Sequence, residues 1–213
     1  MLVHSDTLPL TLFGSAQPGL TAAQPSRTYL DGDSWIDLTQ GWLTGADTLF
    51  AELDKNMAWF RGRRLMYGTW HREPRLTATE PSGEAHQLPA VIDHIRDALS
   101  AHYQRAFMGL FCNYYTCGQD SVAWHADRIG RTTPDPLVAI VSLGGPRTLH
   151  LRPMHGGRSH QVVLASGDLL VMGGASQRQW EHAIPKVSMA APRMSITMRA
   201  GRPDHRSSKE AAR

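Results

Sequence analysis

Apolar residues recur at helical spacing in two segments of the first half of the chain. The first segment opens with Thr44-x-x-Asp47, which reads as a helix-capping box, and predicts a helix that ends near Trp59. The second predicts a helix from Leu88 to Tyr103, with Pro89 suited to its first turn. The apolar positions that line one side of each predicted helix are Leu49, Phe50, Leu53 and Met57, and then Val91, Ile92, Ile95, Ala98 and Leu99.

From residue 107 onward the pattern changes to short apolar runs bounded by Gly and Pro. Strands of this length, separated by turns such as Gly-Gly-Pro and Ser-Gly-Asp, are typical of an all-β sandwich or a double-sheet jelly roll. Ser34–Leu38 adds a short strand ahead of the first helix. The predicted fold class is mostly β with flanking helices (α+β). The later runs are Phe107–Tyr115, Leu137–Leu143, Thr148–Leu151, Gln161–Leu164, Asp168–Met172, Gln179–Ile184 and Met194–Arg199.

Length and composition predict one domain, since 213 residues with 41% hydrophobic content suffice for a single core. We place this domain at residues 34–200, after a flexible arm at 1–33 and before a polar tail at 201–213. No apolar run approaches membrane-spanning length, and no signal peptide is visible. Cys112 and Cys117 fit neither a disulfide framework nor a zinc site, so they read as reduced thiols of a cytoplasmic protein. No obligate protein partner is inferred.

Arginine dominates the positive charge of the chain. Three of the 22 Lys and Arg residues are lysine, which leaves 19 arginines at a net charge of only +3. Arginine favours bidentate contacts with phosphate and carboxylate groups, but a GC-rich genome enriches arginine whatever the function. Residues 61–78 mix five arginines with Tyr67 and Trp70, a mixture that can grip phosphates and stack on bases. A solvated loop whose arginine stems cover apolar surface explains this segment equally well.

The most concentrated candidate chemistry lies in residues 113–127. His125 and Asp127 are two residues apart, so on a strand they project from the same face. With one more histidine they would complete a 2-His-1-carboxylate iron site, which leaves positions open for O2 and a co-substrate. His182 is the best candidate, because it ends a predicted strand and a jelly roll brings late and early strands side by side. Taken alone, a His-x-Asp pair occurs by chance in many chains.

A pair of arginines brackets the strand-forming sequence Met-Ser-Ile-Thr-Met near the end of the domain. Arg193 and Arg199 are six residues apart, so both guanidinium groups face the same side of the predicted strand. Two inward arginines are costly to bury unless an anion meets them, and a dicarboxylic co-substrate would do so. Asn113 and Tyr115 would add neutral donors from a neighbouring strand. The alternative is that both arginines pair with acidic side chains of the protein.

Taken together, these motifs resemble the AlkB family of Fe(II)- and 2-oxoglutarate-dependent dioxygenases. The resemblance rests on Asn113-x-Tyr-x-x-Gly-x-Asp-x-Val-x-x-His-x-Asp127, then His182, then Arg193-x5-Arg199. Glu73-Pro-Arg-Leu-Thr-Ala78 is similar to the nucleotide-recognition lid of the family's demethylases, and Asp168–Gly174 is similar as well. The resemblance spans about residues 59–199 and implies a double-stranded β-helix, a jelly-roll variant, with the lid at about 59–84 and the core at about 105–200.

The family resemblance also implies roles for individual residues. Fe(II) would be bound by His125, Asp127 and His182, which are therefore the catalytic and metal-binding set. The co-substrate 2-oxoglutarate would be bound by Asn113, Tyr115, Arg193 and Arg199, with Arg193 as the partner of its distal carboxylate. Arg75 of the lid and Trp59 would contact substrate. For Trp59, a packing role at the end of the first helix explains the residue about as well.

The activity implied is oxidative demethylation of N-alkylated bases, such as 1-methyladenine and 3-methylcytosine, in DNA or RNA. The reaction would use Fe(II), would consume O2 and 2-oxoglutarate, and would release succinate, CO2 and formaldehyde. The base would be flipped out of a duplex or already single-stranded. The sequence departs from the family at Arg128, where a base-reading carboxylate is usual, and at Thr79 and Glu80, where aromatics are usual. Two alternatives follow: an oxygenase acting on a protein side chain or small metabolite, and a nucleic-acid-binding module without catalysis.

Overall fold

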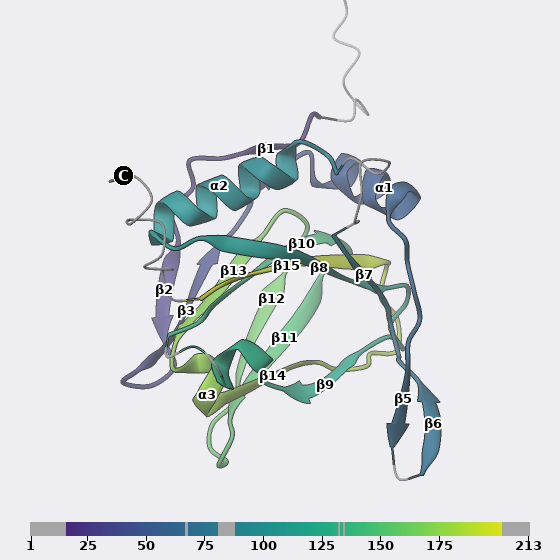
Figure 1. The fold of residues 1–213 in the computed structure, drawn as a ribbon, viewed down its shortest axis with the longest axis vertical. Coiled ribbons are helices and arrows are strands. Elements are labelled where there is room, and N and C mark those ends of the chain that lie inside the picture. The colour runs from purple at the N-terminus through teal and green to yellow at the C-terminus, as the bar shows by residue number, and fades with distance from the viewer. Residues whose placement is uncertain (1–15, 67, 81–87, 132, 134, 202–213) are drawn as a thin grey trace, which may run out of the picture.

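In the computed structural model, which describes residues 16–66, 68–80, 88–131, 133 and 135–201, two antiparallel sheets face each other (Figure 1). The larger sheet has the strand order β2-β3-β13-β10-β15-β8-β7. The smaller sheet has the order β12-β11-β14-β9. Their bounds in chain order are β2 Ser26–Tyr29, β3 Ser34–Thr39, β7 Leu76–Thr79, β8 Phe107–Tyr115, β9 Val122–His125, β10 Leu137–Gly144, β11 Arg147–Pro153, β12 His160–Leu164, β13 Leu169–Gly174, β14 Trp180–Ile184 and β15 Arg193–Ala200.

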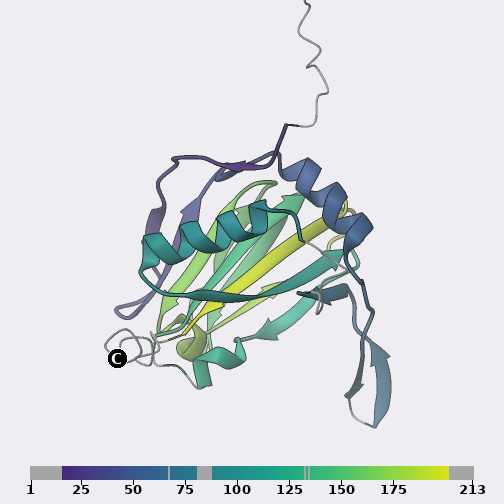
Figure 2. The same ribbon diagram turned by 45° about the horizontal axis from the view of Figure 1, so that its top comes forward.

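Two helices cover the outer face of the larger sheet, α1 (Ala46–Asn56) and α2 (Val91–Tyr103), as both ribbon views show (Figures 1 and 2). Buried leucines and isoleucines of these helices pack against the sheet in one hydrophobic cluster. A second cluster fills the space between the sheets and joins residues such as Ile140 of β10 to Leu149 and Leu151 of β11. Two facing antiparallel sheets with helices behind one of them confirm the predicted mostly β, jelly-roll fold.

The side chains of strand β15 alternate between the layer of helices and the smaller sheet. Its even-numbered residues, from Met194 to Ala200, belong to the cluster under the helices. Its odd-numbered residues, Arg193, Ser195 and Thr197, are buried polar groups on the opposite face, which is turned toward the smaller sheet. Side chains alternate between the faces of a strand, so one face packs against apolar helices while the other is polar. This buried polar face is where the fold places the candidate site.

The later strands agree with the predicted runs to within two residues at each end, and Phe107–Tyr115 matches β8. The last run but one begins later than predicted. Residues Ser176–Gln179 form the short helix α3, so β14 starts at Trp180 rather than Gln179. Strand β9 was not predicted as a separate run. It ends at His125, and the 3-10 helix η1 (Arg128–Arg131) follows closely.

The predicted capping box at Thr44 is wrong. Thr44 belongs to the short strand β4 (Leu43–Thr44), which pairs with β1 (Gly19–Leu20), and its hydroxyl donates to the Gly19 carbonyl at 3.0 Å. The helix instead begins after Gly45, whose left-handed backbone (φ 62°) forms the N-cap, and ends at Asn56, ahead of Trp59. The second helix also begins later than predicted, at Val91, so Pro89 precedes the helix rather than lying in its first turn.

Residues 16–33 differ from the predicted loosely ordered arm, because they contain strands β1 and β2. All four side chains of β2 are exposed, so no apolar period marks it as a strand. Its backbone pairs with β3, and Arg27 forms a bidentate ion pair with the buried Asp37 at 2.7 and 2.8 Å. The Tyr103 hydroxyl of α2 donates to the same carboxylate. Residues 1–15 and most of the predicted tail, 202–213, lie outside the described residues.

A hairpin of β5 (Arg63–Met66) and β6 (Thr69–Arg72) extends away from both sheets, at the lower right of Figure 1. It leads into β7 at the edge of the larger sheet. We call residues 60–79 the lid. Residues 81–84, at the end of the predicted lid, and Tyr67 lie outside the described residues. Within the part of the chain that the structure describes, no helix has the length and apolar character needed to cross a membrane.

Candidate metal and co-substrate site

His125, Asp127 and His182 meet in one place. Each offers a ligand atom, and these atoms all lie within 4.8 Å of one another. His125 ends β9 and pairs across the small sheet with His182 of β14, with their ring centroids 4.2 Å apart. Asp127 lies two residues past His125 and just beyond the end of the strand, so it reaches the histidines from a loop rather than from the expected strand face. The grouping predicted from the sequence is therefore present.

The two imidazoles are suited to donate lone pairs to a metal. Burial, followed by the influence of neighbouring His125, lowers the pKa of His182 to about 3, so His182 is neutral at physiological pH. The Nδ1 atom of His125 lies 2.9 Å from the Ala123 carbonyl oxygen. A proton on Nδ1 satisfies that carbonyl and leaves the Nε2 lone pair available as a ligand. Two neutral imidazoles and a carboxylate are the donor set of a non-haem Fe(II) centre with open positions.

Two side chains hold the Asp127 loop in position. Arg199 of β15 forms a bidentate ion pair with the Asp127 carboxylate, at 3.1 and 3.2 Å. The Asp127 backbone N–H donates to the side-chain oxygen of Gln177 at 2.8 Å, and Gln177 is a buried residue of α3. Arg199 thus pairs with an acidic side chain of the protein, one of the two possibilities that the sequence left open. Both contacts restrain the direction of the carboxylate toward the histidines.

Arg193 lies deeper in the polar face of β15. It is 1% exposed, its Nε donates to the Ser142 hydroxyl at 3.1 Å, and its guanidinium lies 5.3 Å from the centroid of the Tyr115 ring. Burial lowers the pKa of Arg193. Among the ion pairs of the described residues, none involves Arg193. A buried guanidinium without a carboxylate partner is a strong anion-binding group.

Tyr115 and Asn113 lie on the neighbouring strand. In the register of the sheet, Tyr115 stands opposite Arg193, and Asn113 stands opposite Ser195. The Asn113 side-chain oxygen accepts from Arg75 Nε at 2.7 Å, and its amide donates to the Ser195 hydroxyl. Burial raises the pKa of Tyr115, so its phenol is protonated and can donate. The four residues predicted to bind the co-substrate therefore share one face of β8 and β15, with Arg75 of the lid touching it.

Four residues of this region were not assigned a role from the sequence: Ser142, Arg147, Gln177 and Asp120. Arg147 is 4% exposed, and its guanidinium lies 5.5 Å from the Tyr115 ring centroid, on a ring that Arg193 also approaches. Its donors reach the backbone carbonyls of Cys117, Asp120 and Pro185. Asp120 stands inside the motif of residues 113–127, and that position was the one available signal. The others act through contacts between distant segments, which a single sequence does not display.

The aromatic residues around the lid divide into buried and exposed groups. Trp59 is half-buried, packs edge-on against Tyr114 at 5.1 Å, and donates its indole N–H to carbonyls at the end of α1. The structure gives Trp59 this packing role, and base stacking by Trp59 stays a prediction. Trp70 of the hairpin is 64% exposed, with Phe60 and Leu65 exposed as well. The lid thus presents apolar surface to solvent that the fold itself does not use.

Comparisons with known proteins agree with this site. The profile of the 2OG-Fe(II) oxygenase superfamily matches residues 51–202. The chain is 30% identical to alpha-ketoglutarate-dependent dioxygenase alkB homolog 3 of Mus musculus, over 77% of this chain and 64% of that protein. It is 30% identical to DNA oxidative demethylase ALKBH2 of Bos taurus, over 72% of this chain and 64% of that protein. The chain thus spans somewhat less than two thirds of the length of these relatives.

The fold also matches a solved structure. The structure of OsALKBH1 superimposes with a TM-score of 0.56 at 16% identity, covering 82% of this chain and 99% of that chain. At this identity the match shows a shared fold. The superfamily profile covers more than half of the sequence and includes all three residues of the His-Asp-His group. The chain therefore belongs to the 2OG-Fe(II) oxygenase superfamily, and the resemblance to AlkB proteins seen in its sequence is confirmed.

Proposed function

We propose that this protein is an Fe(II)- and 2-oxoglutarate-dependent oxidative demethylase. Its substrates would be DNA or RNA carrying N-methyl lesions of the 1-methyladenine and 3-methylcytosine type. Membership of the superfamily implies Fe(II), 2-oxoglutarate and O2 as the reacting partners. The observation that carries the proposal is the convergence of His125, Asp127 and His182 within 4.8 Å, beside an arginine-bearing polar face.

In this proposal Fe(II) would be bound by His125, Asp127 and His182. The donor set fits Fe(II), because two imidazoles and one carboxylate would leave positions open for exchangeable ligands. Arg199 fixes the orientation of the Asp127 carboxylate through its bidentate contact. It also places a positive charge beside that carboxylate.

The co-substrate 2-oxoglutarate is assigned to the polar face of β8 and β15. Arg193 would bind its distal carboxylate, because a buried guanidinium supported by Ser142 and facing Tyr115 is arranged to meet an anion. Asn113 and Tyr115 would supply neutral donors, and Arg199 would lie at the end of the pocket nearer the metal. Arg193 and Tyr115 are almost fully buried, and electrostatic contacts are stronger in buried surroundings than in water.

When bound, Fe(II) and 2-oxoglutarate supply the oxidation of a C–H bond by O2, with decarboxylation of the co-substrate to succinate and loss of the hydroxylated methyl group as formaldehyde. The residues of this chain contribute placement and electrostatics. Arg193 holds the co-substrate from its far end, and Arg199 and Gln177 hold Asp127 in register with the histidines. The base to be repaired must leave the stack to reach this site.

The lid supports a nucleic-acid substrate. Arg63 and Arg72 face each other in the hairpin register, and the exposed Trp70 offers a flat apolar surface beside them. Phosphate-binding cations next to aromatic surfaces are typical of single-stranded nucleic-acid sites. One of the two relatives described above is named as a DNA oxidative demethylase. We also propose a cytoplasmic location, which is supported by two cysteines that are both free thiols.

A screen of oligonucleotides tests the proposal. The full chain is supplied with Fe(II), ascorbate and 2-oxoglutarate and offered DNA and RNA strands that carry 1-methyladenine or 3-methylcytosine. Formaldehyde release with Asp127→Ala as the blank is the expected result. Succinate production without demethylation of any strand would overturn the substrate assignment while leaving the oxygenase assignment in place.

An alternative substrate is a protein side chain or small metabolite. Arg128 favours it, because this exposed arginine stands where relatives usually carry a base-reading carboxylate. Salt dependence separates the two possibilities. Affinity for a nucleic acid held through phosphate contacts falls steeply as salt rises, whereas affinity for a neutral peptide or metabolite does not.

A further inference from the structure

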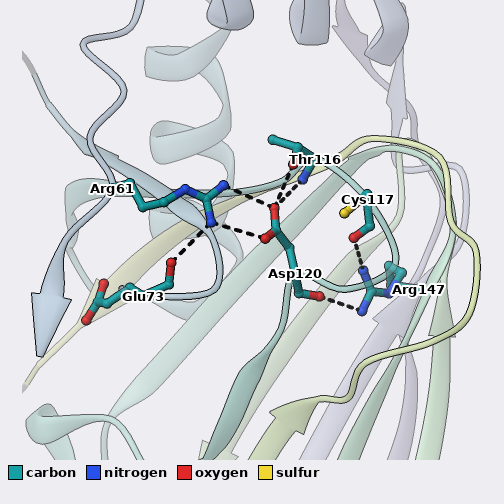
Figure 3. A network of polar contacts seen from close by, with 6 residues as sticks. All are labelled: Arg61, Glu73, Thr116, Cys117, Asp120 and Arg147. Atoms are coloured by element: carbon teal, nitrogen blue, oxygen red, sulfur yellow. Dashed lines mark hydrogen bonds and ion pairs between the residues drawn. The ribbon is translucent and has the colours of Figure 1, made fainter. Parts of the chain in front are cut away.

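Asp120 is the centre of a polar network between the lid and the core (Figure 3). Its carboxylate accepts from Arg61 Nη1 at 3.2 Å and Nη2 at 3.5 Å, and from the backbone N–H and hydroxyl of Thr116 at 2.8 Å each. Burial acts to raise the pKa of Asp120, but the bonds from Arg61 and Thr116 outweigh it, and the pKa is lowered. Asp120 is therefore an ionised carboxylate fixed in place at the base of the lid.

Arg61 connects both arms of the lid to this carboxylate. Besides contacting Asp120, its Nη1 donates to the Glu73 carbonyl at 3.2 Å, as Figure 3 shows. Residue 61 lies at the start of the lid, and Glu73 lies on its returning arm. The Glu73 N–H in turn donates to the Gly62 carbonyl, and the Ser121 N–H donates to the Pro74 carbonyl. One guanidinium thus closes the neck of the lid and joins that neck to the loop at 116–121.

Close packing and hydrogen bonds hold the loop at 116–121 in place. A Cβ atom on Gly118 would lie 2.5 Å from the Val187 carbonyl oxygen, so only glycine allows this loop to pack so closely on the segment that precedes β15. The buried Arg147 donates to carbonyls of Cys117 and Asp120 from the other side. Arg147 also lies against Tyr115 of the proposed co-substrate pocket. The lid is consequently fastened to the same rigid loop that borders that pocket.

We propose that Asp120 is a positioning residue, which acts through Arg61 to hold the lid in a fixed position relative to the core, and so places the substrate for the metal site. The hairpin of the lid projects into solvent, and the Arg61–Asp120 ion pair attaches the neck of the lid to the loop at 116–121. Arg75, further along the lid, makes a second side-chain contact with the core, at Asn113. Asp120 touches no proposed metal ligand. Its effect on turnover therefore runs through the placement of the nucleic-acid substrate, and in this respect the inference rests on the proposed function.

The chain offers a matched control for this pair. Arg27 also forms a two-point contact with a buried carboxylate, that of Asp37, and both arginines are partly exposed. Arg27 lies in β2, at the edge of the larger sheet opposite the lid-bearing edge. Arg61→Met and Arg27→Met each leave one buried carboxylate without its guanidinium, so a merely structural cost appears in both variants.

The experiment compares wild type, Arg61→Met, Asp120→Asn and Arg27→Met as full chains. With a 1-methyladenine oligonucleotide, Arg61→Met and Asp120→Asn, here called the lid variants, should raise KM about tenfold over wild type. Their kcat should stay within about twofold of wild type, because the lid binds the oligonucleotide less well while the metal site is intact. Chymotrypsin should cut after Trp70 several-fold faster in the lid variants, since cleavage follows local opening of the hairpin. Arg27→Met should change neither quantity.

The outcomes are distinguishable. Equal changes in Arg27→Met and Arg61→Met, or a fall in kcat at unchanged KM, would overturn the positioning role. If wild type turns over no oligonucleotide, the proposed function fails, and the chymotrypsin comparison alone decides whether Asp120 holds the lid. Unchanged cleavage at Trp70 in both lid variants would then refute the inference, and faster cleavage would sustain it.

Discussion

The backbone N–H of Asp127 donates to the side-chain oxygen of Gln177 at 2.8 Å. Gln177 is 3% exposed and lies on α3, three residues ahead of the strand that carries His182. One short helix therefore leads into one candidate metal ligand and restrains the backbone of another. Hydrogen bonds of this kind, made to a ligand residue by a residue that does not bind the metal, fix the positions of the ligand atoms before the metal binds.

Gln177→Met should lower metal affinity about tenfold, because methionine keeps the side-chain length and removes the oxygen that holds the Asp127 loop. Co(II) binding, followed by its visible absorption, measures this without requiring turnover. Gln179→Met, on the same helix, is the matched control and should bind Co(II) as wild type does. Equal affinities for all three proteins would contradict a role for Gln177.

Arg193→Met should have opposite effects on stability and on co-substrate binding. The substitution removes a buried guanidinium whose pKa is lowered by burial, so the unliganded protein should be as stable as wild type or more stable. The affinity for 2-oxoglutarate should fall by about 30-fold or more, since breaking a buried charge pair costs about 2 kcal/mol or more. Urea unfolding and calorimetric titration measure the two quantities. A large loss of stability would instead indicate a structural role.

The two thiols should react very differently. Cys117 is exposed, whereas Cys112 is fully buried under α2 and burial raises its pKa to about 12. A thiol reagent should therefore label one cysteine of the native protein at neutral pH and two after unfolding. Rapid labelling of both in the native state would show that the core under α2 opens easily.

The same thiol should make stability depend on alkaline pH. The unfolded chain loses the Cys112 proton near the ordinary pKa of 9.0, while the folded chain retains it up to about 12. This contribution to the free energy of unfolding is fully present below pH 9 and is lost as the pH rises to 12. The total loss over that window is about 4 kcal/mol. Cys112→Val should show a smaller fall in the free energy of unfolding across that window.

Substitutions of Trp59, just before the lid, and of Trp70, within it, should distinguish a packing role from a substrate-contact role. Trp70→Ala removes an exposed ring, so it should leave stability unchanged and weaken oligonucleotide binding by about 1 to 3 kcal/mol. Trp59→Ala removes a ring packed against Tyr114 and α1, so it should destabilise the fold by about 2 kcal/mol or more. A stable Trp59→Ala protein with weakened oligonucleotide binding would favour the stacking role for Trp59.

The sequence predicted best those features that depend on local pattern. Strand β8 was bounded correctly because its apolar run ends in polar turns, and the His-Asp-His group was found because its spacing is part of the motif. Strand β2 was missed because its side chains are all exposed, and its stability comes from backbone pairing and the Arg27–Asp37 contact. The Thr44 cap was misassigned because the hydroxyl bonds to Gly19, a partner distant in sequence.

The supporting residues of the site could not be predicted in the same way. Gln177 and Asp127 are fifty residues apart, and Arg61 and Asp120 are fifty-nine apart. Neither pair leaves a periodic or compositional mark, because each depends on how the lid, α3 and the loop at 116–121 are brought together by the two sheets. The residues proposed to bind metal and co-substrate could be predicted from the sequence, whereas the residues that contact and position them were found only in the fold.

The central claim is tested most directly by the ratio of formaldehyde to succinate formed from a 1-methyladenine or 3-methylcytosine oligonucleotide. Coupled demethylation predicts a ratio close to one, a strand whose mass falls by one methylene group, and no product with Asp127→Ala. Succinate formed in large excess, with every strand keeping its methyl group, would contradict the claim that nucleic acid is the substrate of this site.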